Sequence, residues 1–118
     1  MVTIDLFRKE EDTHAFAAGQ AIFSEGEAGD TMYVVVEGEV DLLVKGKPVD
    51  HLGPGGVLGE MALLDASPRT ATAVARTACR LAPINEKRFR FLVQQTPNFA
   101  LQLMRVIAER LRRMNERL

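Results

Sequence analysis

Apolar residues follow two different spacings along the chain. Between about residues 14 and 83, short apolar runs rich in β-branched and aromatic side chains alternate with turns of Gly, Pro and acidic residues. This pattern is typical of short strands that follow one another about every ten residues, as in an antiparallel barrel or sandwich. The runs predict strands at residues 20–23, 31–36, 40–44, 49–52, 70–75 and 79–83.

Residues 85–118 contain no glycine, and their apolar residues recur at the spacing of a helix. Asn85 is a predicted N-cap, and Thr96-Pro97 predicts a second helix start, because Pro is favoured at the first helical position. One apolar stripe consists of Ala100, Met104, Ile107, Leu111, Met114 and Leu118, and a second row consists of Phe99, Leu103 and Val106. Such a stripe lies on one face of a helix, and it packs either on the chain's own strands or on a second copy of the chain.

The composition fits one soluble domain. The chain has 118 residues, of which 47% are hydrophobic and 26% are charged, enough to bury a core. It has no run of about 18 apolar residues that would predict a membrane span, and its early acidic residues do not fit a secretory signal. The single cysteine, Cys79, excludes an internal disulfide and a cysteine-based zinc site. We therefore expect a cytoplasmic protein without membrane contact.

The net charge of −1 hides an asymmetry between the two halves of the chain. Residues 1–59 hold 4 Lys and Arg against 11 Asp and Glu, whereas residues 60–118 hold 11 against 5. Such a split is typical of an anion-binding half, or of two solvated faces of opposite sign.

The segment with the most chemical information is residues 57–72. A glycine-rich loop ends at Gly59, and the next residues predict about one helical turn, whose first N–H groups are unpaired. Arg69 follows, held between Pro68 and a strand. An arginine beside free amides can receive a phosphate, and the carboxylate of Glu60 can accept hydrogen bonds from hydroxyls. The combination suits a sugar phosphate.

The same segment resembles the phosphate-binding cassette of cyclic nucleotide-binding domains, which occur in catabolite-activator-type regulators, kinase regulatory subunits and gated channels. Residues 58–63 read Leu-Gly-Glu-Met-Ala-Leu and residues 68–72 read Pro-Arg-Thr-Ala-Thr. The family pattern is Phe-Gly-Glu-x-Ala-Leu followed by Pro-Arg-x-Ala-Thr-Val. Residues 19–26 and 29–40 also resemble the first two β-hairpin signatures of the family.

The resemblance implies one cyclic nucleotide-binding domain over residues 1–118. The expected fold is mainly β with C-terminal helices. It consists of an eight-stranded antiparallel β-roll (a double-stranded β-helix, or jelly roll) over about residues 14–83, with a cassette helix. Two helices over residues 85–118 follow the β-roll, and a short helical arm precedes it.

The resemblance also implies roles for individual residues. Arg69 would pair with the phosphate oxygens, and the amides of Ala62 and Thr70 would donate to the same phosphate. Glu60 would accept from the ribose 2′-hydroxyl with help from the Gly59 backbone. The implied binding site consists of Gly59, Glu60, Met61, Ala62, Arg69 and Thr70. The last helix would cover the base with Arg110, Leu111, Met114 and Asn115.

The function implied is non-catalytic binding of a cyclic nucleoside monophosphate, with cAMP favoured and cGMP as the other candidate. Repositioning of the C-terminal helix would carry the signal to a downstream protein that the sequence does not identify. A homodimer through the C-terminal helix is a further expected partner, and no metal is expected.

Three other functions are weaker interpretations. A relative of a transcription regulator without its helix-turn-helix could contact DNA through Arg110, Arg112, Arg113 and Arg117, although intervening glutamates make nucleic-acid binding the lesser expectation. A protein-interaction module without a ligand does not need both Glu60 and Arg69. A cupin-type metal enzyme has a similar barrel but needs more ligands than the two histidines, His14 and His51, supply.

Overall fold

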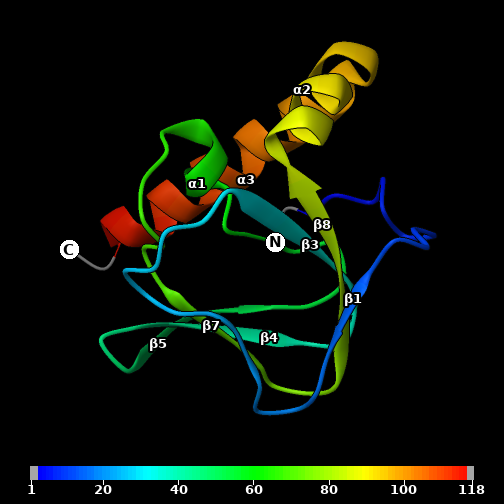
Figure 1. Ribbon diagram of the computed structural model, residues 1–118. Coiled ribbons are helices and arrows are strands. Elements are labelled where there is room, and N and C mark those ends of the chain that lie inside the picture. Colours follow the sequence, from blue (N-terminus) through cyan, green and yellow to red (C-terminus); the bar gives the residue numbers. More distant parts are fainter. Residues whose placement is uncertain (1–2, 117–118) are drawn as a thin grey trace.

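Two four-stranded antiparallel sheets form the strand-rich part of the computed structural model, which describes residues 3–116 (Figure 1). The first sheet has the order β1-β8-β3-β6 and the second has the order β2-β7-β4-β5. The strands are β1 (His14–Phe16), β2 (Ala21–Phe23), β3 (Thr31–Glu37), β4 (Val40–Val44), β5 (Lys47–Leu52), β6 (Val57–Leu58), β7 (Thr72–Ala75) and β8 (Cys79–Asn85). These eight strands, counted over residues 3–116, confirm the predicted antiparallel β-roll.

The two central strands of the first sheet, β3 and β8, are buried on both faces. Val34 and Val35 are neighbours on β3, yet Val35 packs in the core between the two sheets, whereas Val34 packs in a second core beneath the helices. Leu81 and Ala82 divide in the same way on β8. Because successive strand residues point to opposite faces, a strand buried on both sides reads as a nearly continuous apolar run.

Residues 3–116 contain three helices: α1 (Met61–Leu64) lies between β6 and β7, and α2 (Glu86–Gln95) and α3 (Pro97–Glu116) follow β8. The side chain of Asn85 accepts a hydrogen bond from the Arg88 N–H at 2.9 Å, which confirms the predicted N-cap of α2. The predicted start of α3 at Pro97 is also confirmed. Figure 1 shows the C-terminal half of α3 passing beside α1, so that two segments far apart in the sequence lie together.

The face of α3 that packs on the sheet is the shorter of the two predicted apolar rows. The buried residues are Phe99, Leu103 and Val106. The residues of the longer stripe that remain exposed are Met104 at 64%, Leu111 at 58% and Met114 at 61%. The interpretation that the longer stripe packs on the chain's own strands is therefore wrong for these three residues.

Aromatic packing fixes this rotation of α3. The Phe99 ring lies edge-on to Phe7 and to Phe89, with ring centroids 6.2 and 5.9 Å apart. An aromatic side chain buries more apolar area than its neighbours, so the helix turns its Phe99 row inward. Leu118, the last residue of the longer stripe, lies outside the described residues.

Strand β7 begins at Thr72 and not at the predicted residue 70. The Arg69 N–H donates to the Glu27 carbonyl, and the Arg69 carbonyl accepts from the Gly26 N–H, both at 2.8 Å. Because the backbone at Arg69 is paired with this loop, pairing with β4 starts only at Thr72. The loop thus holds Arg69 at the end of the second sheet.

The predicted helical arm before β1 is wrong for residues 3–13, which contain turns but no helix. The Arg8 N–H donates to the Asp5 carbonyl at 3.1 Å and the Glu10 N–H to the Phe7 carbonyl at 3.0 Å, which closes two turns. The Ile4 N–H donates to the Gly55 carbonyl at 2.8 Å, and Ile4 and Phe7 enter the helix-side core. These tertiary contacts override the local helical tendency of the segment.

Candidate functional site

A pocket of about 260 Å³ lies between α1, the β4–β5 hairpin, the segment before β7 and the C-terminal half of α3. Its walls include all six residues of the predicted binding site: Gly59, Glu60, Met61, Ala62, Arg69 and Thr70. Of the four residues predicted to cover the base, Arg110 and Met114 line the pocket. Leu111 and Asn115 are exposed and are not among its lining residues.

Arg69 is a buried cation at the inner wall of this pocket, with only 8% of its surface exposed. Its Nη1 donates to the Gly59 carbonyl at 3.3 Å, and its Cζ lies 4.2 Å from the centroid of the Phe23 ring. Among residues 3–116, no carboxylate comes within ion-pair distance of its guanidinium. Because a buried charge needs a partner, this arginine is suited to pair with an anion.

Two glycines make room for this guanidinium. A Cβ at Gly29 would lie 2.4 Å from the Arg69 Nε, and a Cβ at Gly59 would lie 2.6 Å from its Nη1. Gly59 also has a φ of +77°, which side chains other than glycine rarely adopt. The glycine at position 59 is thus required both by its backbone conformation and by the close approach of Arg69.

Glu60, the second buried polar residue of the predicted site, is already bound by the last helix. Its carboxylate accepts a hydrogen bond from Arg110 Nη1, and Arg110 Nη2 also donates to the Val57 carbonyl. Glu60 is 7% exposed, and its side chain does not cap α1. A hydroxyl that binds Glu60 must therefore share the carboxylate with Arg110.

Asp50 and Arg113 form a second link between α3 and the pocket. Arg113 donates to both carboxylate oxygens of Asp50, at 3.1 and 3.0 Å, and this hydrogen bonding raises the pKa of Arg113 above its usual value. Arg110 Nε lies 3.8 Å from the same carboxylate, whose side chain is 10% exposed. Sequence reasoning missed both residues as parts of the site. The three-residue spacing from Arg110 could have indicated Arg113, but a lone aspartate in a strand gives no signal.

The charged side chains of the pocket sum to one positive charge. Its lining holds three arginines and two carboxylates. Arg110 is paired with Glu60 and Arg113 is paired with Asp50. The remaining cation is Arg69, so the pocket as a whole is suited to a ligand with one negative charge.

The backbone N–H groups of Ala62 and Thr70, expected to bind the phosphate together with Arg69, lie in different local structures. The Ala62 N–H donates to the Gly59 carbonyl at 3.3 Å, a long bond made by the first turn of α1. Thr70 is exposed and lies in the irregular segment between Arg69 and β7. The Arg69 guanidinium is the one fully charged group among the expected phosphate contacts.

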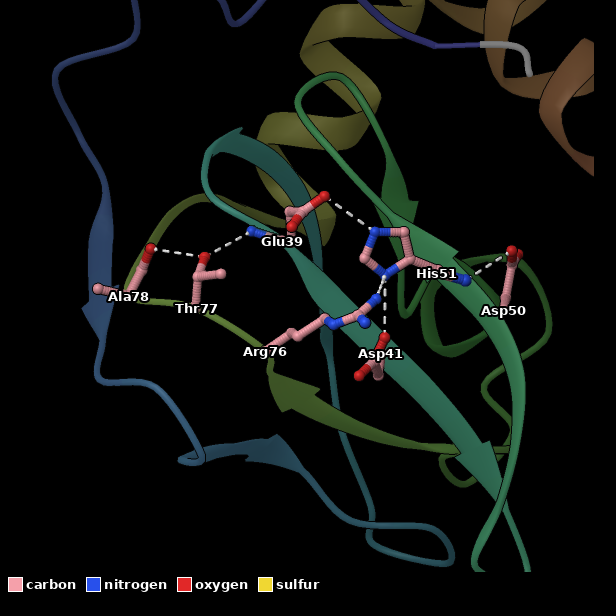
Figure 2. A network of polar contacts seen from close by, with 7 residues as sticks. All are labelled: Glu39, Asp41, Asp50, His51, Arg76, Thr77 and Ala78. Atoms are coloured by element: carbon pink, nitrogen blue, oxygen red, sulfur yellow. Dashed lines mark hydrogen bonds and ion pairs between the residues drawn. The ribbon is translucent and has the colours of Figure 1, made fainter.

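A separate polar network surrounds His51 on the outer side of the β4–β5 hairpin (Figure 2). Its Nδ1 lies 2.9 Å from an Asp41 carboxylate oxygen and its Nε2 lies 3.0 Å from a Glu39 oxygen. The hydrogen bond to Asp41, followed by the one to Glu39, raises the pKa of His51 above 6.5. Arg76 Nη1 approaches the same Nδ1 at 3.3 Å. Figure 2 also shows that the His51 backbone N–H reaches Asp50, which links this network to the pocket wall.

The two histidines do not share a site. His14 lies on β1 of the first sheet and His51 lies on β5 of the second. In residues 3–116, no three His, Cys, Asp or Glu side chains are grouped so that they could hold a metal ion. The geometry therefore gives no support to the cupin-type interpretation.

Comparisons with known proteins agree with this geometry. Residues 13–96 match the family model described as the cyclic nucleotide-binding domain. The CRP-like cAMP-activated global transcriptional regulator of Mycobacterium tuberculosis is 32% identical over 108 residues, which cover 87% of this chain and 48% of that protein.

Solved structures give the same result. The catabolite activator protein of Thermus thermophilus has a TM-score of 0.82 and 31% identity, over 96% of this chain and 55% of that chain. The EAL enzyme Bd1971 in its cAMP-bound form has a TM-score of 0.65 and 38% identity, over 87% of this chain and 29% of that chain. Its cGMP-bound form has a TM-score of 0.66 and 34% identity, over 88% of this chain and 29% of that chain.

The chain therefore belongs to the cyclic nucleotide-binding domain family, which confirms the resemblance seen in the sequence. It spans about half the length of the curated relatives it matches. Within residues 3–116, no helix is both long enough and apolar enough to cross a membrane.

We expect His51 to titrate above pH 6.5, because its protonated ring can donate to both Asp41 and Glu39. A pKa that is raised in the folded state stabilises the fold below pH 6.5, and this contribution is lost as the pH rises through the folded pKa. An NMR titration of the ring protons measures this pKa, and Asp41→Asn is expected to lower it. A wild-type His51 that titrates at or below 6.5 would contradict this network.

Proposed function

We propose that this chain binds a cyclic nucleoside monophosphate in the pocket around Arg69, without turning it over. The observation that carries the proposal is a buried arginine that has no carboxylate partner among the described residues, in a chain of this family. A cyclic phosphodiester carries one negative charge, which matches the single excess positive charge of the lining. The rest of the lining is mostly apolar, and its other charges are the ion pairs Arg110–Glu60 and Arg113–Asp50, which suits reversible binding.

Different residues of the pocket suit different parts of the ligand: the phosphate, the ribose and the base. The planar guanidinium of Arg69 suits two phosphate oxygens, and the carboxylate of Glu60 suits a ribose hydroxyl. The apolar side chains of Leu42, Val44, Val49, Met61 and Met114 offer a surface to a purine base. The cAMP-bound and cGMP-bound forms of the EAL enzyme support both nucleotides as candidates. We favour cAMP, because the similar transcriptional regulators are cAMP-activated.

Calorimetric titration with cAMP and cGMP tests this function. We expect binding heat with the wild type, and tighter binding of cAMP than of cGMP. Arg69→Ala is expected to weaken binding roughly 100-fold, because loss of one partner of a buried charge pair costs about 3 kcal/mol. Arg90→Ala is the control, since the Arg90 side chain is 74% exposed and its ion pair within residues 3–116 is with Glu86 at the surface.

Two outcomes of this titration would refute parts of the proposal. An absence of heat with both nucleotides would refute the function. Equal binding by wild type and Arg69→Ala would refute the site.

We also propose that the ligand signals by moving α3. Arg110 and Arg113 attach this helix to Glu60 and Asp50, both in the pocket wall. A ribose hydroxyl at Glu60 competes with Arg110 for the carboxylate, so ligand binding changes the contacts that hold the helix. The ligand thereby shifts the population between two positions of α3.

Hydrogen exchange of the α3 amides measures this movement. Asp50→Asn removes the charge that Arg113 pairs with, so exchange at residues 110–116 is expected to accelerate about 10-fold, the effect of about 1.4 kcal/mol. Saturating cAMP is expected to change the exchange of the same segment in the wild type. Glu86→Gln is the control, because it alters an exposed pair on α2. Unchanged α3 exchange in a cAMP-saturated protein would contradict the proposed signal.

A second copy of the chain is the proposed partner for the exposed apolar side of α3. Met104, Leu111 and Met114 lie on one helix face at spacings of seven and three residues, as in the seam of a helix pair. Exposed methionine and leucine in such a row favour burial against another surface. Pairing there would join the helices that carry the proposed signal.

Direct contact of α3 with DNA is the weaker proposal. Two of the four arginines that could contact phosphates, Arg110 and Arg113, are bound to carboxylates in the structure. Arg117 lies outside the described residues. The similarity to a transcriptional regulator covers 48% of that protein and therefore concerns only part of it.

A further inference from the structure

The guanidinium of Arg69 lies against an aromatic ring. A buried arginine in a protein is usually paired with a carboxylate instead. Its Cζ lies 4.2 Å from the centroid of the Phe23 ring, at the end of β2. We propose that Phe23 is a positioning residue for nucleotide binding, which fixes the guanidinium of Arg69 and leaves its charge free for the phosphate. The proposal rests on the proposed function of the pocket.

The chemistry of the ring explains why it suits this place. A cation over an aromatic face is attracted to the negative face of the ring, and the attraction is largest where water is excluded. A carboxylate in the same place would neutralise Arg69 and compete with an incoming phosphate. The ring stabilises the cation but accepts none of its strong hydrogen bonds, so the N–H groups of Arg69 that do not bind the Gly59 carbonyl remain available.

Other segments restrict the guanidinium further. The backbone at Gly29 comes so close that an added Cβ would lie 2.5 Å from both Cζ and Nη2 of Arg69. At Gly59 an added Cβ would lie 3.3 Å from Phe23 Cε2 as well as 2.6 Å from Arg69 Nη1. The ring, the guanidinium and these two glycines are therefore packed as one unit.

The Phe23 ring is in turn fixed by the opposite sheet. Tyr33 on β3 stacks on it, with ring centroids 6.4 Å apart and an interplanar angle of 28°. Arg69, Phe23 and Tyr33 thus form a stack that joins the second sheet to the first. Tyr33 also touches Phe16, whose ring lies edge-on at 6.5 Å. Phe16 therefore offers a matched control, because it contacts the stack but not Arg69.

The test is a calorimetric titration of cAMP into four proteins: wild type, Phe23→Leu, Phe23→Tyr and Phe16→Leu. Phe23→Leu keeps an apolar side chain but removes the ring, and we expect it to weaken binding about 10-fold. Phe23→Tyr restores the aromatic face and is expected to bind within about 2-fold of wild type. Phe16→Leu is expected to bind as the wild type does.

A double-mutant cycle with Arg69→Lys separates positioning from general packing. The loss caused by Phe23→Leu should shrink in the Arg69→Lys background, because the flat guanidinium that stacks on the ring is absent. An NMR measurement of the Arg69 side-chain protons in the wild type without nucleotide gives an independent readout. We expect an upfield ring-current shift, and this readout applies even if Phe23→Leu fails to fold.

The outcomes distinguish this inference from the proposed function. A wild type that does not bind cAMP or cGMP overturns the function, and the positioning role with it. A wild type that binds while Phe23→Leu binds equally well overturns the positioning role alone. Equal losses in Phe23→Leu, Phe23→Tyr and Phe16→Leu, or unshifted Arg69 protons, also overturn the role and indicate packing only.

Discussion

The burial of Arg69 without a carboxylate is the constraint on which the rest of the site depends. Removing a charge from water costs several kcal/mol unless other groups replace the solvent. Here the Phe23 ring, the Gly59 carbonyl and the close approach of Gly29 replace it in part. An anion in the pocket would offset the part of the desolvation cost of Arg69 that these groups leave. That offset would favour binding of the anion.

The position of α3 depends on the charged residues of the same pocket. If the carboxylates of Glu60 and Asp50 were unpaired, they would repel an anionic ligand. Arg110 and Arg113 neutralise them from α3. The helix is therefore part of the pocket and not only a cover for it. Because Arg110 binds the carboxylate that we propose as the ribose contact, we propose that occupancy of the pocket and the position of α3 are linked.

Much of this architecture could be predicted from the sequence, because turn residues bound six of the eight strands and Asn85 and Pro97 mark the helix starts. The short strands β1 and β6 were not predicted, because runs of three and two residues give too little pattern. The cassette likewise located Arg69 and Glu60. The rotation of α3 could not be predicted, since its two apolar rows are one residue apart and the spacing fits both. Asp50 was missed because only the folded chain brings its strand beside α3.

A crystal structure of the chain with cAMP is the most direct test of the binding site. We expect both free phosphate oxygens at hydrogen-bond distance from the Arg69 guanidinium, roughly 2.7–2.9 Å, as in charge-assisted pairs. We also expect the guanidinium to remain stacked on Phe23 and a ribose hydroxyl to contact Glu60. A phosphate that binds Arg110 or Arg113 and leaves Arg69 without a partner, or a nucleotide outside this pocket, would contradict the proposed site.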